Sequence, residues 1–167
     1  MDYPIRKPNR LKNLDYGEDG FYFVTICTKE KRHLLSSIPV GDGFPVPLLT
    51  NTGLLVERQI LSISEHFPDA VPEKHVIMPN HIHMILILRA NRHGTGDPSP
   101  TLGSVIGWFK YQTTREVNRI SGTVGQPFWQ RSYHDHIIRN DAEHLSSWQY
   151  IDTNPSRWNL DCYYEPM

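Results

Sequence analysis

The residues of this sequence with the clearest chemical meaning are two histidines, His81 and His83, one residue apart at the start of an apolar run. Successive side chains of an extended strand point to opposite faces of a sheet, so both imidazoles would project from the same face. Two imidazoles held this way can bind a divalent metal ion if a third ligand comes from elsewhere in the chain. A pair of histidines on a sheet face can equally be solvated without a metal. A metal site is therefore a hypothesis that needs a second element.

A predicted helix near the C-terminus supplies that second element, because it carries Tyr150 and Asn154. With about 100° per residue and Leu145 set at zero, Trp148 lies near about 300° and Ile151 near about 240°. These three residues form an apolar stripe. Tyr150, near about 140°, and Asn154, near about 180°, belong to the polar face instead, and their four-residue offset lets both reach the same ligand. The pattern predicts that Tyr150 is not a core residue.

Hydrophobic periodicity predicts the elements that would position these residues. Strands are expected at 21–28, 74–78, 82–88 and 128–138, and an irregular insertion at 29–52. Helices are expected at 53–67, at 102–120 with Ser99 or Thr101 as the cap, and from a capping box at 140–143 onward. Pro68 and Pro72 would end the first helix, and Pro155 would end the last one at Asn154.

The order of the core elements is therefore β-α-β-β-α-β followed by one helix. This order predicts the α+β class, with a ferredoxin-like split βαβ arrangement in which helices cover one face of an antiparallel sheet. We expect a single domain over residues 1–167, with its core at about 21–158. The polar stretch after residue 88 is not a domain boundary, because neither half of the chain would hold a complete sheet.

The composition is that of a globular protein without disulfides or membrane spans. No apolar stretch approaches the roughly 20 residues that a membrane span needs, and no apolar signal region follows the N-terminal charges. The two cysteines, Cys27 and Cys162, are far apart and lack metal-type spacing, which indicates reduced thiols in a cytoplasmic protein.

Charge is unevenly distributed along the chain, although the net charge is only −1. Residues 1–14 and 100–140 each carry +3, whereas residues 41–75 carry −3 and residues 141–167 carry −4. Such a division could present basic grooves to a polyanion, or it could be scattered, solvated charge. Under the first interpretation, the candidate DNA contacts are Arg6, Lys7, Arg10, Lys110, Arg115 and Arg131.

Four segments together resemble a known family. They are residues 78–83 (MPNHIH), 128–133 (FWQRSY), 135–140 (DHIIRN) and 150–155 (YIDTNP). In order and spacing they are similar to the REP-associated tyrosine transposases, relatives of the small single-tyrosine HUH transposases of insertion sequences. The resemblance extends from Phe21 to about Trp158, and the stretch 29–52 contributes little to it.

The resemblance implies a metal-dependent endonuclease and strand transferase that acts on single-stranded DNA carrying a hairpin, through a 5′-phosphotyrosine intermediate. It implies that His81 and His83 bind Mg²⁺ or Mn²⁺ and that Tyr150 is the nucleophile. Asn154 matches the polar residue that completes the metal site, where small relatives often have Gln. Members of the family act as monomers or as homodimers with shared active sites.

Other residues and other functions also follow from the sequence. His136, in a same-face pair with His134, is a candidate neighbour of the active site. Five aromatic residues could stack on unpaired bases or instead fill the core or cover the open sheet face, namely Trp108, Phe128, Trp129, Tyr133 and Trp158. One alternative is a catalytically inactive DNA-hairpin-binding protein derived from a transposase. Another is an unrelated metal-dependent hydrolase that uses the two histidines, which would leave the placement of Tyr150 and Asn154 unexplained.

Overall fold

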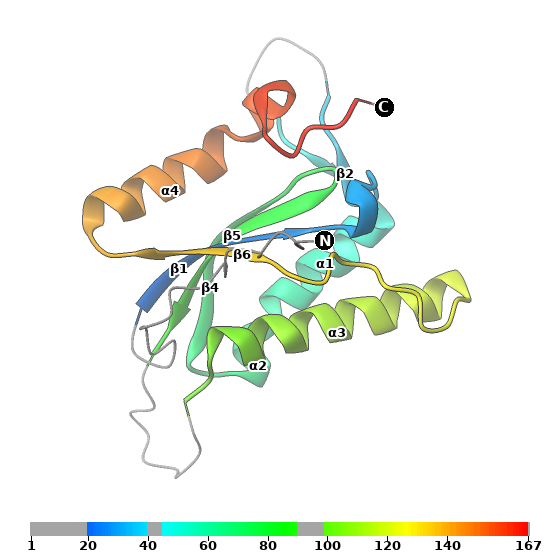
Figure 1. The fold of residues 1–167 in the computed structure, drawn as a ribbon, viewed down its shortest axis with the longest axis horizontal. Coiled ribbons are helices and arrows are strands. Elements are labelled where there is room, and N and C mark those ends of the chain that lie inside the picture. The colour runs from blue at the N-terminus through cyan, green and yellow to red at the C-terminus, as the bar shows by residue number, and fades with distance from the viewer. Residues whose placement is uncertain (1–19, 40–44, 90–98, 167) are drawn as a thin grey trace, which may run out of the picture.

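A four-stranded antiparallel sheet lies at the centre of the computed structural model, which describes residues 20–39, 45–89 and 99–166 (Figure 1). Its strands are β1 (Gly20–Cys27), β4 (Ala70–Ile77), β5 (His81–Leu88) and β6 (His134–Ile138). They lie side by side in the order β4-β5-β1-β6, and every neighbouring pair is antiparallel. This is the strand order of a ferredoxin-like sheet, so the predicted fold class is confirmed.

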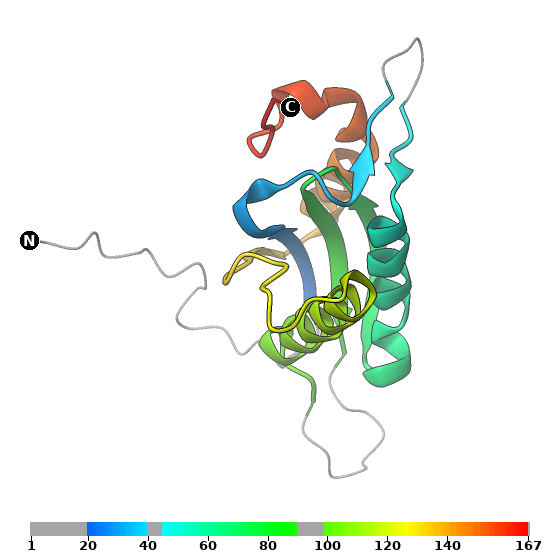
Figure 2. The ribbon, with the colours of Figure 1, turned by 90° about the vertical axis from the view of Figure 1, so that its right-hand side faces the viewer.

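Helices cover both faces of this sheet (Figures 1 and 2). One face packs against α1 (Asn51–Leu61), α2 (Ile63–His66) and α3 (Leu102–Ser121). The other face lies under α4 (Asp141–Thr153), which continues into a 3-10 helix, η2 (Pro155–Leu160). No helix in the described ranges combines the length and the apolar character that crossing a membrane would require.

Strict alternation along β5 separates the hydrophobic core from the polar site. Ile82, Met84 and Leu86 are fully buried in the core between the sheet and the helices α1 and α3. His81 and His83 alternate with them and therefore face α4. The sequence of β5 thus places the two imidazoles on the sheet face that α4 covers.

The stretch 29–52 is more regular than expected. It contains a 3-10 turn, η1 (Lys29–Lys31), two short paired strands, β2 (Ser36–Ser37) and β3 (Leu48–Leu49), and the first residues of α1. Thr50 caps α1 by accepting a hydrogen bond from the Gly53 amide. Only glycine fits at position 53, because a Cβ there would lie 2.0 Å from the carbonyl oxygen of Leu35.

Three predicted element boundaries were wrong. The helix expected at 53–67 begins at Asn51 and is interrupted at Ser62. The strand expected at 74–78 begins at Ala70 and contains Pro72, which is tolerated because β4 is an edge strand. The strand expected at 128–138 begins only at His134. Trp129 instead makes one isolated bridge to Thr28 and fills the core with its side chain.

Candidate metal and tyrosine site

The imidazoles of His81 and His83 lie together on the α4 face of the sheet, as their spacing predicts. Their Nε2 atoms are 3.0 Å apart, and the two residues are 0 and 1% exposed. An ion in octahedral coordination with bonds of 2.0–2.1 Å holds neighbouring ligand atoms about 2.8–3.0 Å apart. The separation of the two nitrogens is that of a hydrogen bond between the rings, and it also fits two ligands of one divalent cation.

The far nitrogen of each ring has a hydrogen-bond partner that fixes the orientation of the ring. His81 Nδ1 lies 2.8 Å from Oδ1 of Asn80, which only accepts, so Nδ1 carries the proton and Nε2 has a lone pair that faces Nε2 of His83 at 3.0 Å. His83 Nδ1 lies 2.8 Å from the Thr25 hydroxyl, which can donate or accept. His83 can therefore also present a lone pair at Nε2, with Thr25 accepting the proton of Nδ1.

Asp161 is the third member of the cluster, and sequence reasoning missed it. Its ligand atom and those of His81 and His83 all lie within 4.8 Å of one another, and its side chain is fully buried. Oδ1 accepts a 2.7 Å hydrogen bond from the backbone amide of Tyr163. Asp161 lies in an irregular segment beyond the last periodic element, so no pattern marked it.

Asn154, the predicted last ligand, lies next to Asp161. It is 3% exposed, caps the C-terminal end of α4, and donates a 2.6 Å hydrogen bond from Nδ2 to Oδ2 of Asp161. Its amide oxygen is buried and has no hydrogen-bond partner among the described residues. A buried oxygen without a partner is costly, and a cation would satisfy it. The two imidazoles and the Asp161 carboxylate form a group that could hold a metal ion, and the Asn154 amide lies next to that carboxylate.

Tyr150 borders the histidine pair from α4. Its ring centroid is 5.2 Å from that of His83 and 5.8 Å from that of Phe23, and the residue is 40% exposed. The predicted apolar stripe was partly wrong, because Leu145 is 56% exposed and Ile151 is the buried residue of the helix. The inner face of α4 carries both polar and apolar side chains, because the sheet face beneath it is itself partly polar.

A second tyrosine, Tyr163, also contacts the pair. Its ring centroid is 4.8 Å from that of His81 and 6.0 Å from that of His83. Burial, the largest effect, raises the pKa of its hydroxyl. Sequence reasoning gave Tyr163 no role, since it lies outside every motif.

Burial also sets the protonation of the site. Desolvation lowers the pKa of His81 to about 3 and the pKa of His83 well below its usual value, which keeps both imidazoles neutral and able to bind a metal. Burial, and after it the negative charge of Asp161, raises the pKa of the Tyr150 hydroxyl to about 12. The tyrosine is therefore protonated at neutral pH in the metal-free protein.

The structure places the other predicted site residues in different surroundings. His134 lies on the site face of β6, with its ring centroid 6.2 Å from that of Tyr163, and His136 Nε2 is 3.3 Å from a Glu143 carboxylate oxygen. Lys110 donates to the carbonyl oxygens of Gln130 and Arg131, at 2.6 and 3.0 Å. Arg6, Lys7 and Arg10 lie outside the described residues.

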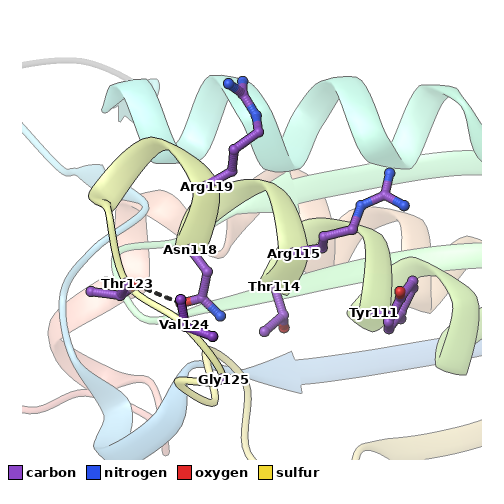
Figure 3. Close-up of a pocket in the computed structure, with 8 residues that line it drawn as sticks. All are labelled: Tyr111, Thr114, Arg115, Asn118, Arg119, Thr123, Val124 and Gly125. Atoms are coloured by element: carbon purple, nitrogen blue, oxygen red, sulfur yellow. Dashed lines mark hydrogen bonds between the residues drawn. The ribbon is translucent and has the colours of Figure 1, made fainter.

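Arg115 is an exposed residue of α3 (Figure 3), and α3 and α4 lie on opposite faces of the sheet (Figure 1). Its guanidinium carbon is 5.8 Å from the ring centroid of Tyr111, and both residues line a pocket of about 400 Å³. The sheet separates this pocket from α4, so the structure does not bring Arg115 together with Tyr150.

Comparison with known proteins finds similarity both in sequence and in fold. No family model matches the chain. An uncharacterised protein of Haemophilus influenzae is 34% identical, over 95% of this chain and 93% of its own length. The structure of a REP-associated tyrosine transposase bound to a REP hairpin aligns with a TM-score of 0.62 at 20% identity, covering 91% of this chain and 76% of that one. A proposed transposase from Deinococcus radiodurans aligns with a TM-score of 0.51 at 14% identity, covering 86% of this chain and 95% of that one.

Proposed function

We propose that this chain is a metal-dependent DNA endonuclease and strand transferase. It belongs to the same family as the Haemophilus influenzae protein, and it has the fold of the REP-associated tyrosine transposase. Its substrate would be single-stranded DNA next to a hairpin, and its intermediate a 5′-phosphotyrosine. The observation that carries the proposal is the position of Tyr150, whose ring is 5.2 Å from that of His83 in a cluster able to bind metal.

His81, His83 and Asp161 would hold the metal, with the amide oxygen of Asn154 as a fourth donor. Imidazole nitrogens and carboxylate and amide oxygens suit Mn²⁺, and the oxygens suit Mg²⁺. When bound, such a cation withdraws charge from the scissile phosphate and stabilises the negative charge that develops there. Asn80 and Thr25 would keep the two imidazoles aimed at the ion through the hydrogen bonds to their Nδ1 atoms.

Tyr150 would act as the nucleophile. Its Oη attacks the phosphorus and loses its proton, the bond from phosphorus to the 3′ oxygen breaks, and that oxygen takes up a proton to leave a free 3′-hydroxyl. The new phosphotyrosine bond conserves the energy of the phosphodiester, so a later hydroxyl can rejoin the strand without ATP. The raised pKa of Tyr150 makes the metal-free protein a poor catalyst, because little phenolate is present near pH 7.

Access to the site favours an unpaired strand as the substrate. His81 and His83 are almost fully buried, whereas Tyr150 beside them is 40% exposed, so a phosphate would approach the histidines from the side of the tyrosine. A flexible single strand can follow such a path better than a stiff duplex. The relative in fold that was solved with a REP hairpin supports a hairpin beside the cleaved strand.

The burial of the histidines also favours a second candidate, a DNA-hairpin-binding protein that no longer cleaves. Such a protein would bind the hairpin without needing a metal. An unrelated metal-dependent hydrolase is less well supported, because it would not explain why Tyr150 and Asn154 lie beside the same cluster.

Cleavage of a labelled hairpin with single-stranded flanks distinguishes these functions. We expect a chelator to abolish cleavage, Mg²⁺ or Mn²⁺ to restore it, and the double variant His81→Ala, His83→Ala to bind the hairpin without cleaving it. Wild-type cleavage by that variant would contradict the proposed metal site. Tight binding with no cleavage under any metal would favour the inactive binding protein.

A further inference from the structure

A second concave surface lies beside the candidate site and has no role in the function proposed above. It is a cavity of about 670 Å³, within the range of about 300–1,000 Å³ typical of ligand pockets. One wall comes from residues within 33–39 together with Pro45 and Thr50, and the other from residues within 155–165, which follow α4. The cavity thus lies where two segments far apart in the sequence meet.

The walls of this cavity are flat and largely apolar. Trp158 lines the cavity. Its ring centroid is 5.7 Å from that of His33 and 5.2 Å from that of Tyr164. Four prolines add rigid apolar surface, namely Pro39, Pro45, Pro79 and Pro155. Rigid aromatic surfaces of this kind bind planar rings, and base stacking on aromatic side chains is the usual way in which proteins hold unpaired nucleotides.

One polar atom of the lining has no partner. The Nε2 atom of His33 is buried and makes no hydrogen bond within the described parts of the chain. Leaving such an atom unsatisfied is unfavourable. The lining itself also offers polar side chains beside the aromatic surface, among them Ser156 and Asn159. Aromatic surface beside polar side chains suits a nucleobase better than a purely apolar ligand.

The cavity adjoins the candidate metal site at one residue. The Trp158 ring that lines the cavity has its centroid 5.9 Å from that of His81. Glu165 also lines the cavity, and its carboxylate forms an ion pair with Lys31, with 3.1 Å between the oxygen and Nζ. For a DNA strand with one phosphate at the histidines, the shared Trp158 ring would bring a neighbouring base to this cavity.

We propose that this cavity binds one unpaired nucleobase of the DNA strand, adjacent to the cleaved phosphate and stacked against Trp158. The inference rests on the proposed function, since it takes the DNA strand as the ligand. It assigns to Trp158 and His33 the selection of the flanking base, which the metal and the tyrosine cannot provide, because both act on the sugar-phosphate backbone.

Binding of hairpins with single abasic sites tests this proposal without any cleavage step. Fluorescence anisotropy would give the Kd of hairpins whose flanks lack one base at each position in turn, in the presence of a chelator. For the wild type we expect one position at which loss of the base weakens binding roughly 5- to 150-fold. Trp158→Ala should weaken binding of the intact hairpin by a similar factor. For this variant, removing the base at that position should cause no further change in Kd.

Trp108→Ala is the matched control. Trp108 is also half-buried and stacks on a histidine, with its ring centroid 4.5 Å from that of His66, but it packs against the core formed with α1 and α3. This variant should keep the dependence on the one base. Trp158→Phe should keep most of it too, because an aromatic ring remains.

A hairpin with 2-aminopurine at the critical position provides a measurement that needs no variant. Its fluorescence should be quenched on binding to the wild-type protein, because the base stacks. Equal loss of affinity at every abasic position, together with no quenching at any position, would overturn the cavity proposal while leaving hairpin binding intact. If the wild type bound no hairpin at all, the proposed function would fail with it.

Discussion

The amide nitrogen of Asn154 lies 2.6 Å from Oδ2 of Asp161 and holds the segment after α4 against the end of that helix. This contact joins the residue expected to complete the metal site to an acidic residue outside every motif. It leaves the amide oxygen of Asn154 as a buried acceptor without a partner in the described structure. The Asp161 carboxylate thus lies beside the paired histidines, and the Asn154 amide lies beside that carboxylate.

Replacing Asp161 by asparagine should weaken binding of Mn²⁺ by at least about 10-fold, because the variant keeps the shape of the side chain but removes the charged ligand. Titration calorimetry would measure the change. Asp152→Asn is the control, since Asp152 lies on α4, pairs with Lys74 at 2.5 Å and has a side chain that is 53% exposed. Equal affinities of the wild type and Asp161→Asn for Mn²⁺ would remove Asp161 from the site.

The Thr25 hydroxyl should matter for metal binding although it is not a ligand. Thr25→Val removes the hydrogen bond to His83 Nδ1 at nearly constant volume, and loss of such a partner typically lowers metal affinity about 10–100-fold. Thr28→Val is the matched control, because Thr28 is also buried near the end of β1 but its hydroxyl bonds only the backbone carbonyls of Arg32 and Asn80. If both variants bind Mn²⁺ equally well, the Thr25 hydroxyl has no role in positioning His83 for the metal.

Acid should destabilise the metal-free protein through its buried histidines. The pKa of His81 is lowered to about 3 and that of His83 well below the ordinary 6.5, so the unfolded chain binds more protons than the folded one below that pH. The free energy of unfolding should therefore fall as the pH drops from about 7 to about 5, as urea denaturation with a chelator present would show. The double variant His81→Gln, His83→Gln should have a shallower slope, with His75 as a remaining contributor. An unchanged slope would mean that the pair does not titrate in this way.

Lys110 should act on stability more than on DNA binding. Its ammonium group bonds two backbone carbonyls, and burial lowers its pKa. Lys110→Met should cost about 1–2 kcal/mol of unfolding free energy and leave the salt dependence of hairpin binding unchanged. Arg131 is exposed, so Arg131→Ala should instead leave stability unchanged and reduce that salt dependence. The reverse pattern would identify Lys110 as a phosphate contact.

The sequence predicted the parts of the site that follow from periodicity. Alternation along β5 placed His81 and His83 on one face, and the four-residue offset placed Tyr150 and Asn154 on one side of α4. Asp161 could not be found this way, because its position depends on how the chain turns through η2 back toward the sheet. A non-periodic segment carries no signal for such a turn.

The errors in the sequence analysis have a common physical cause. A helical wheel identifies an apolar stripe but not the face that meets the sheet, and α4 covers a sheet face that carries buried histidines. Ile151 is therefore buried while Leu145 is exposed. The strand predicted at 128–138 was too long for a related reason. Trp129 is a buried aromatic residue that reaches the core from an irregular segment and does not extend a strand.

The proposed mechanism requires that Tyr150, and not its neighbour Tyr163, attacks the DNA. Both rings contact the histidine pair, which makes Tyr163→Phe the closest control. Tyr22, buried in the core, and Tyr133, packed against it, serve as structural controls. Each variant removes one oxygen, so folding and hairpin binding should survive in all of them.

The most direct measurement is to locate the covalent adduct. Wild-type protein incubated with Mn²⁺ and a hairpin labelled on its 3′ flank should yield a denaturation-resistant adduct that retains the label. Digestion and mass spectrometry should then find a nucleotide 5′-phosphate on the peptide containing Tyr150. Tyr163→Phe should still form this adduct, whereas Tyr150→Phe should bind the hairpin and form none. An adduct on any other tyrosine, or undiminished cleavage by Tyr150→Phe, would show that Tyr150 is not the nucleophile.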